Sequence, residues 1–154
     1  MKSVDGHGAL RRGLTVIELL LALVIAAVLT AIAIPAYRNH VIRSQRADAI
    51  AALLRVQSAQ EKYFVQYGRY ATQLTAEPPA GLGLPETSDR GYYRVQLQAS
   101  EEGVMPPSYI ATAIVVPGGG ADDDRRCRSF SIDQNGLRRA YDADGHERTD
   151  DCWR

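Results

Sequence analysis

Hydrophobic and polar residues alternate in three different ways along the chain, and the first pattern is an unbroken apolar run near the N-terminus. Residues 14–34 read LTVIELLLALVIAAVLTAIAI, and Glu18 is the only ionisable side chain among them. A helix of about 20 apolar residues can cross the roughly 30 Å hydrocarbon layer of a bilayer. Because the polar residues precede the run, the pattern favours a retained spanning helix over a cleaved secretory signal.

The second pattern is a helical period that resumes directly after Pro35. Between residues 47 and 70, apolar side chains recur every three or four positions, as in a helix that lies on a core. Proline removes a backbone N–H and clashes with the preceding turn, so we expect either a kink at Pro35 or the end of the membrane span there. The sequence predicts one long helix over residues 14–67, with Gly68 as its stop. We expect the nearby aromatic residues to form core beneath a sheet rather than a stacking platform for nucleic acid; they are Tyr63, Phe64, Tyr67 and Tyr70.

The third pattern is the two-residue alternation of β-strands in the C-terminal half. Residues 71–90 are rich in proline and glycine and are expected to form a surface connection. After them, four segments have the pattern of strands: residues 93–99, 108–116, 129–132 and 137–141. The dipeptide Asn135-Gly136 indicates a hairpin turn, because Asn-Gly accepts positive φ. The predicted fold class is therefore α+β, with a long N-terminal helix packed on a four-stranded antiparallel sheet.

Charge is balanced over the whole chain but not along it. The 154 residues include 18 basic and 18 acidic side chains, which suits one ordinary domain plus an accessory element and gives no overall attraction to nucleic acid. Any such contact must therefore be local. The candidates for a basic strip are Arg125, Arg126, Arg128, Arg138 and Arg139. The aspartates at 122–124 favour a neutralised surface instead.

Candidates for metal binding and catalysis are weak. Cys127 and Cys152 are the only cysteines, and their spacing does not suit zinc. In an oxidising compartment a disulfide between them would close a loop of about 25 residues, and two free buried thiols are the alternative. Residues 142–147 (DADGHE) resemble the start of a calcium loop but lack its later glutamate, which favours a polar turn. We expect no metal, no cofactor and no enzymatic activity, because no catalytic triad or phosphate-binding loop is present.

The junction ahead of the apolar run is the most informative motif. Residues 11–18 read RRGLTVIE, which resembles the leader junction of type IV pilins and pseudopilins. A carboxylate at the centre of a spanning helix costs about 2.5–3.5 kcal/mol. Glu18 lies only one turn into the helix, where the positive end of the helix dipole favours it. The dipole alone could explain Glu18 in a stationary anchor, but it does not explain the surrounding motif.

The resemblance to type IV pilins implies how the N-terminal region is processed. It implies cleavage after Gly13 by a prepilin peptidase and N-methylation of Leu14, which stands where Phe is usual. Glu18 would pair with the N-terminal amine of a neighbouring subunit, and Pro35 also matches the family. The chain then divides into a leader (1–13), a hydrophobic transmembrane and polymerisation helix (14–35) and an exported globular pilin domain (36–154). The resemblance further implies a disulfide between Cys127 and Cys152 that closes the C-terminal region.

Within this family, the C-terminal half looks most like a PilE-like minor pilin. The resemblance implies a non-catalytic pilus subunit that serves motility, adhesion or DNA uptake. It also implies partners: other pilins, the prepilin peptidase/N-methyltransferase, an inner-membrane platform protein, an assembly ATPase and a secretin. The precursor would cross the inner membrane once, with a cytoplasmic N-terminus and a periplasmic domain, before it joins a cell-surface pilus. The alternatives are a DNA-binding minor pilin that acts as an uptake receptor, and a pseudopilin of a type II secretion system.

Overall fold

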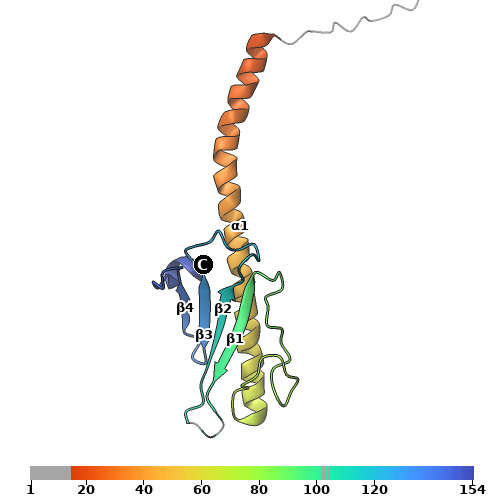
Figure 1. The fold of residues 1–154 in the computed structure, drawn as a ribbon, viewed down its shortest axis with the longest axis vertical. Helices are drawn as coiled ribbons and strands as arrows, with labels where there is room; N and C mark the ends of the chain where they lie inside the picture. The colour runs from red at the N-terminus through yellow and green to blue at the C-terminus, as the bar shows by residue number, and fades with distance from the viewer. Residues whose placement is uncertain (1–14, 102, 104) are drawn as a thin grey trace, which may run out of the picture. The chain divides into compact units, whose positions relative to one another are not determined.

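The protein is described here from a computed structural model, which covers residues 15–101, 103 and 105–154. Its elements are α1 (Val16–Tyr67), β1 (Tyr93–Ala99), β2 (Tyr109–Val115), β3 (Ser129–Asp133), β4 (Arg138–Tyr141) and α2 (Thr149–Cys152) (Figure 1). The chain divides into two compact units, Met1–Arg38 and Asn39–Arg154. The predicted fold class, a long N-terminal helix with a four-stranded antiparallel sheet, is confirmed.

In the first unit, α1 is an apolar helix whose side chains no other described residue covers. Every residue from 15 to 38 is exposed. The Thr15 hydroxyl accepts the backbone N–H of Glu18 at 3.2 Å, which caps the start of the helix. The Thr30 hydroxyl donates to the carbonyl of Ala26 at 2.9 Å, so this polar group is satisfied within the helix. By length and composition alone, α1 could cross a membrane, and it stays helical through Pro35.

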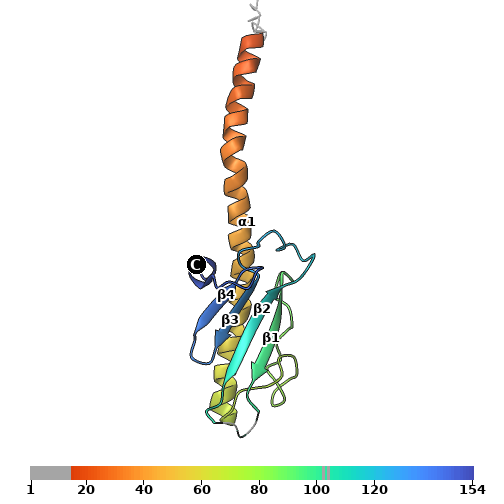
Figure 2. The ribbon, with the colours of Figure 1, turned by 60° about the vertical axis from the view of Figure 1, so that its left-hand side comes forward.

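In the second unit, α1 packs on one face of the sheet (Figure 2). The strands are hydrogen-bonded in the order β1-β2-β3-β4, and every neighbouring pair is antiparallel. Ala49, Leu53 and Val56 recur at helical spacing on the buried side of α1. They share one core with the inward-facing strand residues, among them Val95 and Phe130. The apolar residues that recur with the helical period in α1 and with the two-residue period in the strands thus pack together in a single layer.

The strand register assigns each residue of the sheet to one of two faces. On the inner face, Val95, Ala113, Phe130 and Ala140 form a buried row across the four strands. The outer face carries mostly polar side chains at the alternate positions. β2 is apolar on both faces, but only its inner face is covered, and Ile110 on the outer face is 48% exposed. The outer face of the sheet is therefore an open surface.

The prediction for the aromatic residues at the end of α1 is wrong in part. Tyr63 is buried, but its hydroxyl donates to the carbonyl of Pro79 at 2.7 Å, in the segment predicted as a surface loop. Tyr67 remains exposed, whereas the ring of Tyr70 contacts Tyr109 in β2. The reason is that residues 71–90 fold back against α1 and occupy the place that the sheet was expected to fill. Ala71 in that segment is fully buried and makes two hydrogen bonds with the Gln60 side chain, at 2.9 and 2.8 Å.

The turn between β3 and β4 differs from a two-residue Asn-Gly hairpin. Gly136 has φ of +75°, but among the described residues no non-glycine has positive φ, so Asn135 does not. The N–H of Asp133 donates to the carbonyl of Leu137 at 3.2 Å. The Asp133 carboxylate also accepts the N–H groups of Asn135 and Leu137, both at 2.9 Å. Three residues therefore form the loop, with glycine at the one position that requires the left-handed conformation.

Candidate nucleic-acid interface

A disulfide fixes the position of the segment that carries most of the candidate arginines. Cys127 and Cys152 are bonded, with their Cα atoms 5.8 Å apart, and both are fully buried. Cys127 lies just before β3, whereas Cys152 ends α2, a short helix that the sequence did not predict. The bond therefore ties the C-terminal residues to the segment 125–128. With the cysteines oxidised, the alternative of two free thiols does not apply to this structure.

A buried ion pair holds the same segment to α1. Nε and Nη2 of Arg46 donate to the two carboxylate oxygens of Asp124 at 2.6 and 2.9 Å, a bidentate geometry that strengthens the pair. Arg46 is 15% exposed and Asp124 only 3%. Nη1 of Arg46 also donates to the backbone carbonyl of Asp151 at 3.2 Å. One guanidinium thus holds together α1, the β2–β3 connection and α2.

The five arginines predicted as a basic strip do not form one continuous strip. Arg125, Arg126 and Arg139 are exposed, and among the described residues their guanidinium groups have no hydrogen-bond or ion-pair partner. Nη1 of Arg128 donates to the carbonyl of Asp122 at 3.3 Å and lies 3.8 Å from its carboxylate. The Arg138 guanidinium lies 5.1 Å from the centre of the Trp153 ring. Because neighbours in a strand point to opposite faces, Arg138 and Arg139 lie on opposite sides of β4.

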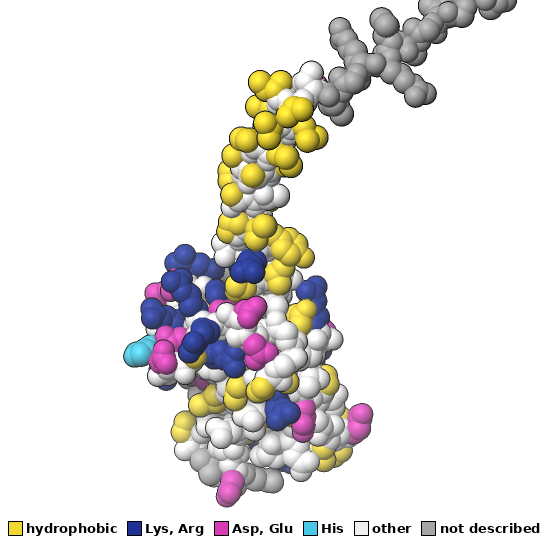
Figure 3. Space-filling model, turned by 45° about the horizontal axis from the view of Figure 1, so that its top comes forward, with side chains coloured by type: hydrophobic (Ala, Val, Ile, Leu, Met, Phe, Trp, Pro, Cys, Tyr) yellow, Lys and Arg dark blue, Asp and Glu magenta, His cyan; other side chains and the backbone are white. Residues whose placement is uncertain are grey.

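Two of the arginines face a shared hollow at the end of the sheet. Arg125 and Arg128 line a cavity of about 700 Å³ together with Ile114, Ser129, Ala143 and the aspartates Asp122 and Asp142. Asp122 accepts the N–H of Gly118 at 2.7 Å and pairs with Arg128. Asp142 pairs with Arg148 at 3.2 Å. Both carboxylates are therefore engaged with partners, as the predicted neutralised surface requires, while Arg125 is available to an external anion. Figure 3 shows basic and acidic side chains interspersed on this unit.

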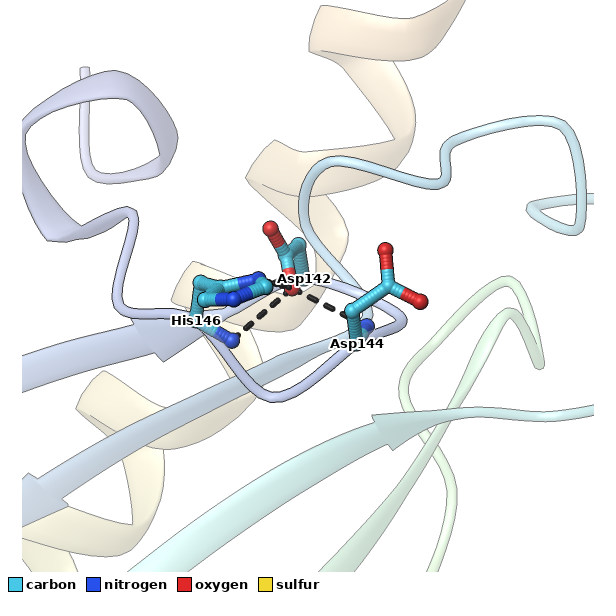
Figure 4. A group of neighbouring side chains, drawn as sticks. All are labelled: Asp142, Asp144 and His146. Atoms are coloured by element: carbon cyan, nitrogen blue, oxygen red, sulfur yellow. Dashed lines mark hydrogen bonds and ion pairs between the residues drawn. The ribbon is translucent and has the colours of Figure 1, made fainter.

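Residues 142–146 form a polar turn around the carboxylate of Asp142 (Figure 4). Asp142, Asp144 and His146 each bring a potential ligand atom within 4.8 Å of the others. However, Asp142 Oδ1 already accepts the backbone N–H groups of Asp144 and His146, at 3.0 and 2.9 Å. The hydrogen bond from the His146 N–H is the main reason that the pKa of Asp142 is lowered, and the hydrogen bond from the Arg148 side chain lowers this pKa further. These hydrogen bonds account for the arrangement of the three side chains as a polar turn.

Comparison with known proteins assigns the chain to a family. A family model described as "Type IV minor pilin ComP, DNA uptake sequence receptor" matches residues 35–131, which is more than half of the chain. The chain belongs to this family of type IV minor pilins. The matched range includes β1, β2 and the segment that carries Arg125, Arg126 and Arg128.

Relatives of this minor pilin include major pilins. The type IV major pilin protein PilE1 of Neisseria gonorrhoeae is 28% identical over 105 residues, 68% of this chain and 61% of that protein. A fimbrial protein of Neisseria meningitidis serogroup A is 31% identical over 106 residues, 68% of this chain and 59% of its own length. The matches thus span about three fifths of these relatives. The solved minor pilin PilV of N. meningitidis matches 70% of this chain and 93% of that structure, with a TM-score of 0.49 and 20% identity.

The predicted processing and assembly residues stay predictions. Gly13 and Leu14 lie outside the described residues. Glu18 is exposed in the first turn of α1, and Pro35 lies inside that helix.

Sequence reasoning overlooked Arg94 as a possible contact residue. Arg94 is exposed on the outer face of β1 and, within the described ranges, has no ion-pair or hydrogen-bond partner for its side chain. Its position between the buried Tyr93 and Val95 was a sequence signal that could have placed it on the open face.

Proposed function

We propose that this chain is a minor subunit of a type IV pilus whose globular unit binds DNA for uptake. The observation that carries the proposal is the family match over residues 35–131, since that family is described as a DNA uptake sequence receptor. The exposed, unpartnered guanidinium groups of Arg125 and Arg126 supply cations for phosphate contacts. Pilins of this family are structural proteins, and the proposed role is binding and assembly without catalysis.

The apolar helix supplies the assembly part of this function. Cleavage after Gly13 frees the amine of Leu14, which is then methylated, and the residues that follow remain as the anchor. In a bundle of such helices, the amine of one subunit neutralises Glu18 of another, because an unpaired charge in an apolar surrounding is costly. Lipid and apolar helices offer similar surroundings, so packing, this charge match and an assembly motor must drive the transfer from membrane to filament.

The machinery and location follow the same proposal. The precursor spans the inner membrane once, with residues 1–13 in the cytoplasm and the globular domain in the periplasm. A prepilin peptidase, a platform protein, an ATPase and a secretin then act on the subunit, and other pilins surround it in the surface filament. These partners follow from how type IV pili are built. The domain limit at residue 13 follows from the leader motif, and the limit at residue 35 follows from the end of the apolar run at Pro35.

DNA binding is tested directly with the purified full chain in non-ionic detergent. Fluorescence anisotropy with a labelled duplex should show binding that weakens steeply with salt, because arginine–phosphate contacts release counterions. The double variant Arg125→Ala/Arg126→Ala should bind more weakly at every sequence and lower the salt slope by about 1 per lost contact.

A matched control removes an arginine that lies elsewhere. Arg55 on α1 pairs with Asp89 through its Nη1 atom at 2.6 Å and is distant in sequence from residues 125–139. Arg55→Ala should leave both affinity and salt slope unchanged. If the wild-type chain shows no salt-sensitive retention of DNA, the DNA-binding part of the proposal is wrong and only the pilus-subunit part remains.

A further inference from the structure

Within the four strands, the outer face of the sheet has two rows of side chains without a carboxylate. The first row is Arg94, Ile114, Ser129 and Tyr141, and the second is Gln96, Thr112, Ser131 and Arg139. Beyond β4, Glu147 is bridged to Tyr141 at the end of the first row, and its carboxylate accepts the Thr149 hydroxyl at 2.8 Å. In the third row, Asp133 is opposite Ile110, but its carboxylate is engaged by the backbone of the β3–β4 turn. The strand positions of the two rows are therefore cationic, polar or apolar, and the bordering carboxylates of Asp133 and Glu147 each accept hydrogen bonds from this chain.

This face is open to solvent, and its two cations are available. Arg94 and Arg139 are exposed, and in the part of the chain that the structure describes neither guanidinium has a hydrogen-bond or ion-pair partner. α1 packs on the opposite face, and Trp153 contacts the ring of the inward-facing Phe130. A hollow of about 360 Å³ on the outer face is lined by residues that include Thr112, Ser131, Arg139 and Tyr141.

The spacing of the two arginines is of the same order as the width of a DNA groove. β1 and β4 are separated by three strand spacings, and Arg94 and Arg139 lie in adjacent rows, two residues apart along the strands, so their backbones are roughly 16 Å apart. The major groove of B-DNA is about 12 Å wide and is flanked by phosphates of both strands. Between the arginines, Thr112 and Ser131 are small hydroxyl side chains that leave room for the duplex and can donate to phosphate oxygens.

We propose that double-stranded DNA lies across the outer face of the sheet, with Arg94 and Arg139 contacting phosphates on the two sides of one groove. This inference rests on the DNA-binding function proposed above and extends its contact surface from residues 125–128 to β1 and β4. The two surfaces are continuous, because Ser129 lines both the hollow at Arg125 and Arg128 and the hollow on the outer face.

The composition of the two rows favours a duplex over a single strand. Single-stranded DNA is typically held by aromatic rings on which successive bases stack, in addition to a basic groove. Tyr141 is the one aromatic residue in the two rows, so successive bases have no stacking platform. Backbone contacts from separated cations remain, and these suit the two phosphate rows of a duplex.

The test compares two adjacent arginines that lie on opposite faces of the same strand. Arg94→Ala and Arg139→Ala should each weaken binding of the full chain to a labelled 20-base-pair duplex by at least about threefold at 100 mM salt, and lower the salt slope by about 1. Arg138→Ala removes the same charge one residue away, on the inner side, and should change the affinity less than twofold. Arg139→Lys should keep most of the affinity that Arg139→Ala loses, because lysine also neutralises a phosphate. Thermal unfolding of each variant shows that the fold is kept.

Each other outcome has a distinct meaning. If Arg125→Ala/Arg126→Ala weakens binding while Arg94→Ala and Arg139→Ala do not, the outer-face inference is wrong and the proposed function stands. Equal losses for Arg138→Ala and Arg139→Ala would mean that only net charge matters, which also overturns the inference. If the variants lose more affinity for a single strand of the same sequence than for the duplex, the assignment of a duplex is wrong. Absence of any DNA binding by the wild-type chain overturns both proposals together.

Discussion

The two units of this chain differ in what covers their apolar side chains. In residues 15–38, every side chain is exposed, including leucines, isoleucines and valines on all sides of α1. In Asn39–Arg154, one side of α1, which includes Ala49, Leu53 and Val56, is buried in the core of the same chain. Exposing a large aliphatic side chain costs about 1.5–3 kcal/mol, so the first unit requires lipid or other helices, whereas the second is complete within itself. Under the proposed function, one helix serves assembly at one end and folding at the other.

The most damaging change expected in the first unit is removal of Glu18. Glu18→Ala should leave membrane insertion and leader cleavage largely intact but reduce incorporation into filaments more than tenfold, because the neighbouring amine loses its counter-charge in an apolar bundle. Immunoblots of sheared filaments against whole cells measure this ratio. Glu86→Ala removes an equal charge from an exposed position in the second unit and should have little effect. Wild-type levels of the Glu18→Ala protein in filaments would contradict the assembly role.

The largest change expected in the second unit is loss of its buried ion pair. Arg46→Met leaves Asp124 buried without its cation, which should lower the free energy of unfolding by about 3–5 kcal/mol. Arg55→Met provides the matched control, since the Arg55–Asp89 pair is 42% and 63% exposed and should contribute only about 0–1 kcal/mol. Chemical denaturation of both variants measures the difference. Equal effects would mean that burial does not govern these two pairs.

The disulfide should stabilise the second unit alone. Replacing both cysteines (Cys127→Ser/Cys152→Ser) opens a loop closed across a sequence separation of 25 residues, which should cost about 3.5 kcal/mol by the chain-entropy estimate. Denaturation of the variant measures this cost, and protease digestion should show the cuts concentrated in residues 142–154. Unchanged helicity of α1 and unchanged membrane insertion would confirm that the first unit is independent of the bond. Wild-type stability of the variant would mean that the bond restrains nothing in the unfolded chain.

A smaller effect is expected where an aspartate competes with DNA for an arginine. Asp122 pairs with Arg128, so Asp122→Asn should free the guanidinium and raise duplex affinity by about 1.4- to fivefold, which corresponds to the 0.2–1 kcal/mol of an exposed pair. Asp123→Asn makes the same charge change at an exposed neighbour and should have the smaller effect. Anisotropy titrations at fixed salt compare the two. Equal gains would show that only net charge changes the affinity.

The smallest change concerns alkaline pH. Burial raises the pKa of Tyr109 to about 12 and also raises the pKa of Tyr93. The folded state therefore holds these protons more tightly than the unfolded state, and stability should fall as pH rises from about 10 toward 12. Because the Tyr109 hydroxyl has no hydrogen-bond partner among the described residues, Tyr109→Phe should be nearly neutral at pH 7. The Tyr109→Phe variant should lose less stability at high pH than the wild-type chain, and thermal unfolding across this pH range measures the difference. Identical pH profiles for the two proteins would contradict the prediction.

Periodicity predicted the elements well because each period reflects one face of burial. The buried face of β1 and the buried face of α1 follow from local spacing alone. The partners of polar residues could not be predicted in the same way, because they depend on distant segments. Asp124 looks like one of three equivalent aspartates in sequence, and only the folded chain places it against Arg46, 78 residues away. For the same reason, the predicted basic strip contains only arginines that are close together in the sequence. Arg94 lies in β1, at the other edge of the sheet from β4, and was overlooked.

The measurement that tests the account most directly is the mass of the mature protein recovered from sheared surface filaments. The account predicts recovery of this chain with a methylated Leu14 as its first residue and with the whole apolar segment present. Intact mass spectrometry together with N-terminal sequencing decides the question. A product that begins upstream of Leu14, or that has been trimmed beyond Ile34, would contradict the proposal that the apolar helix assembles the subunit into a pilus.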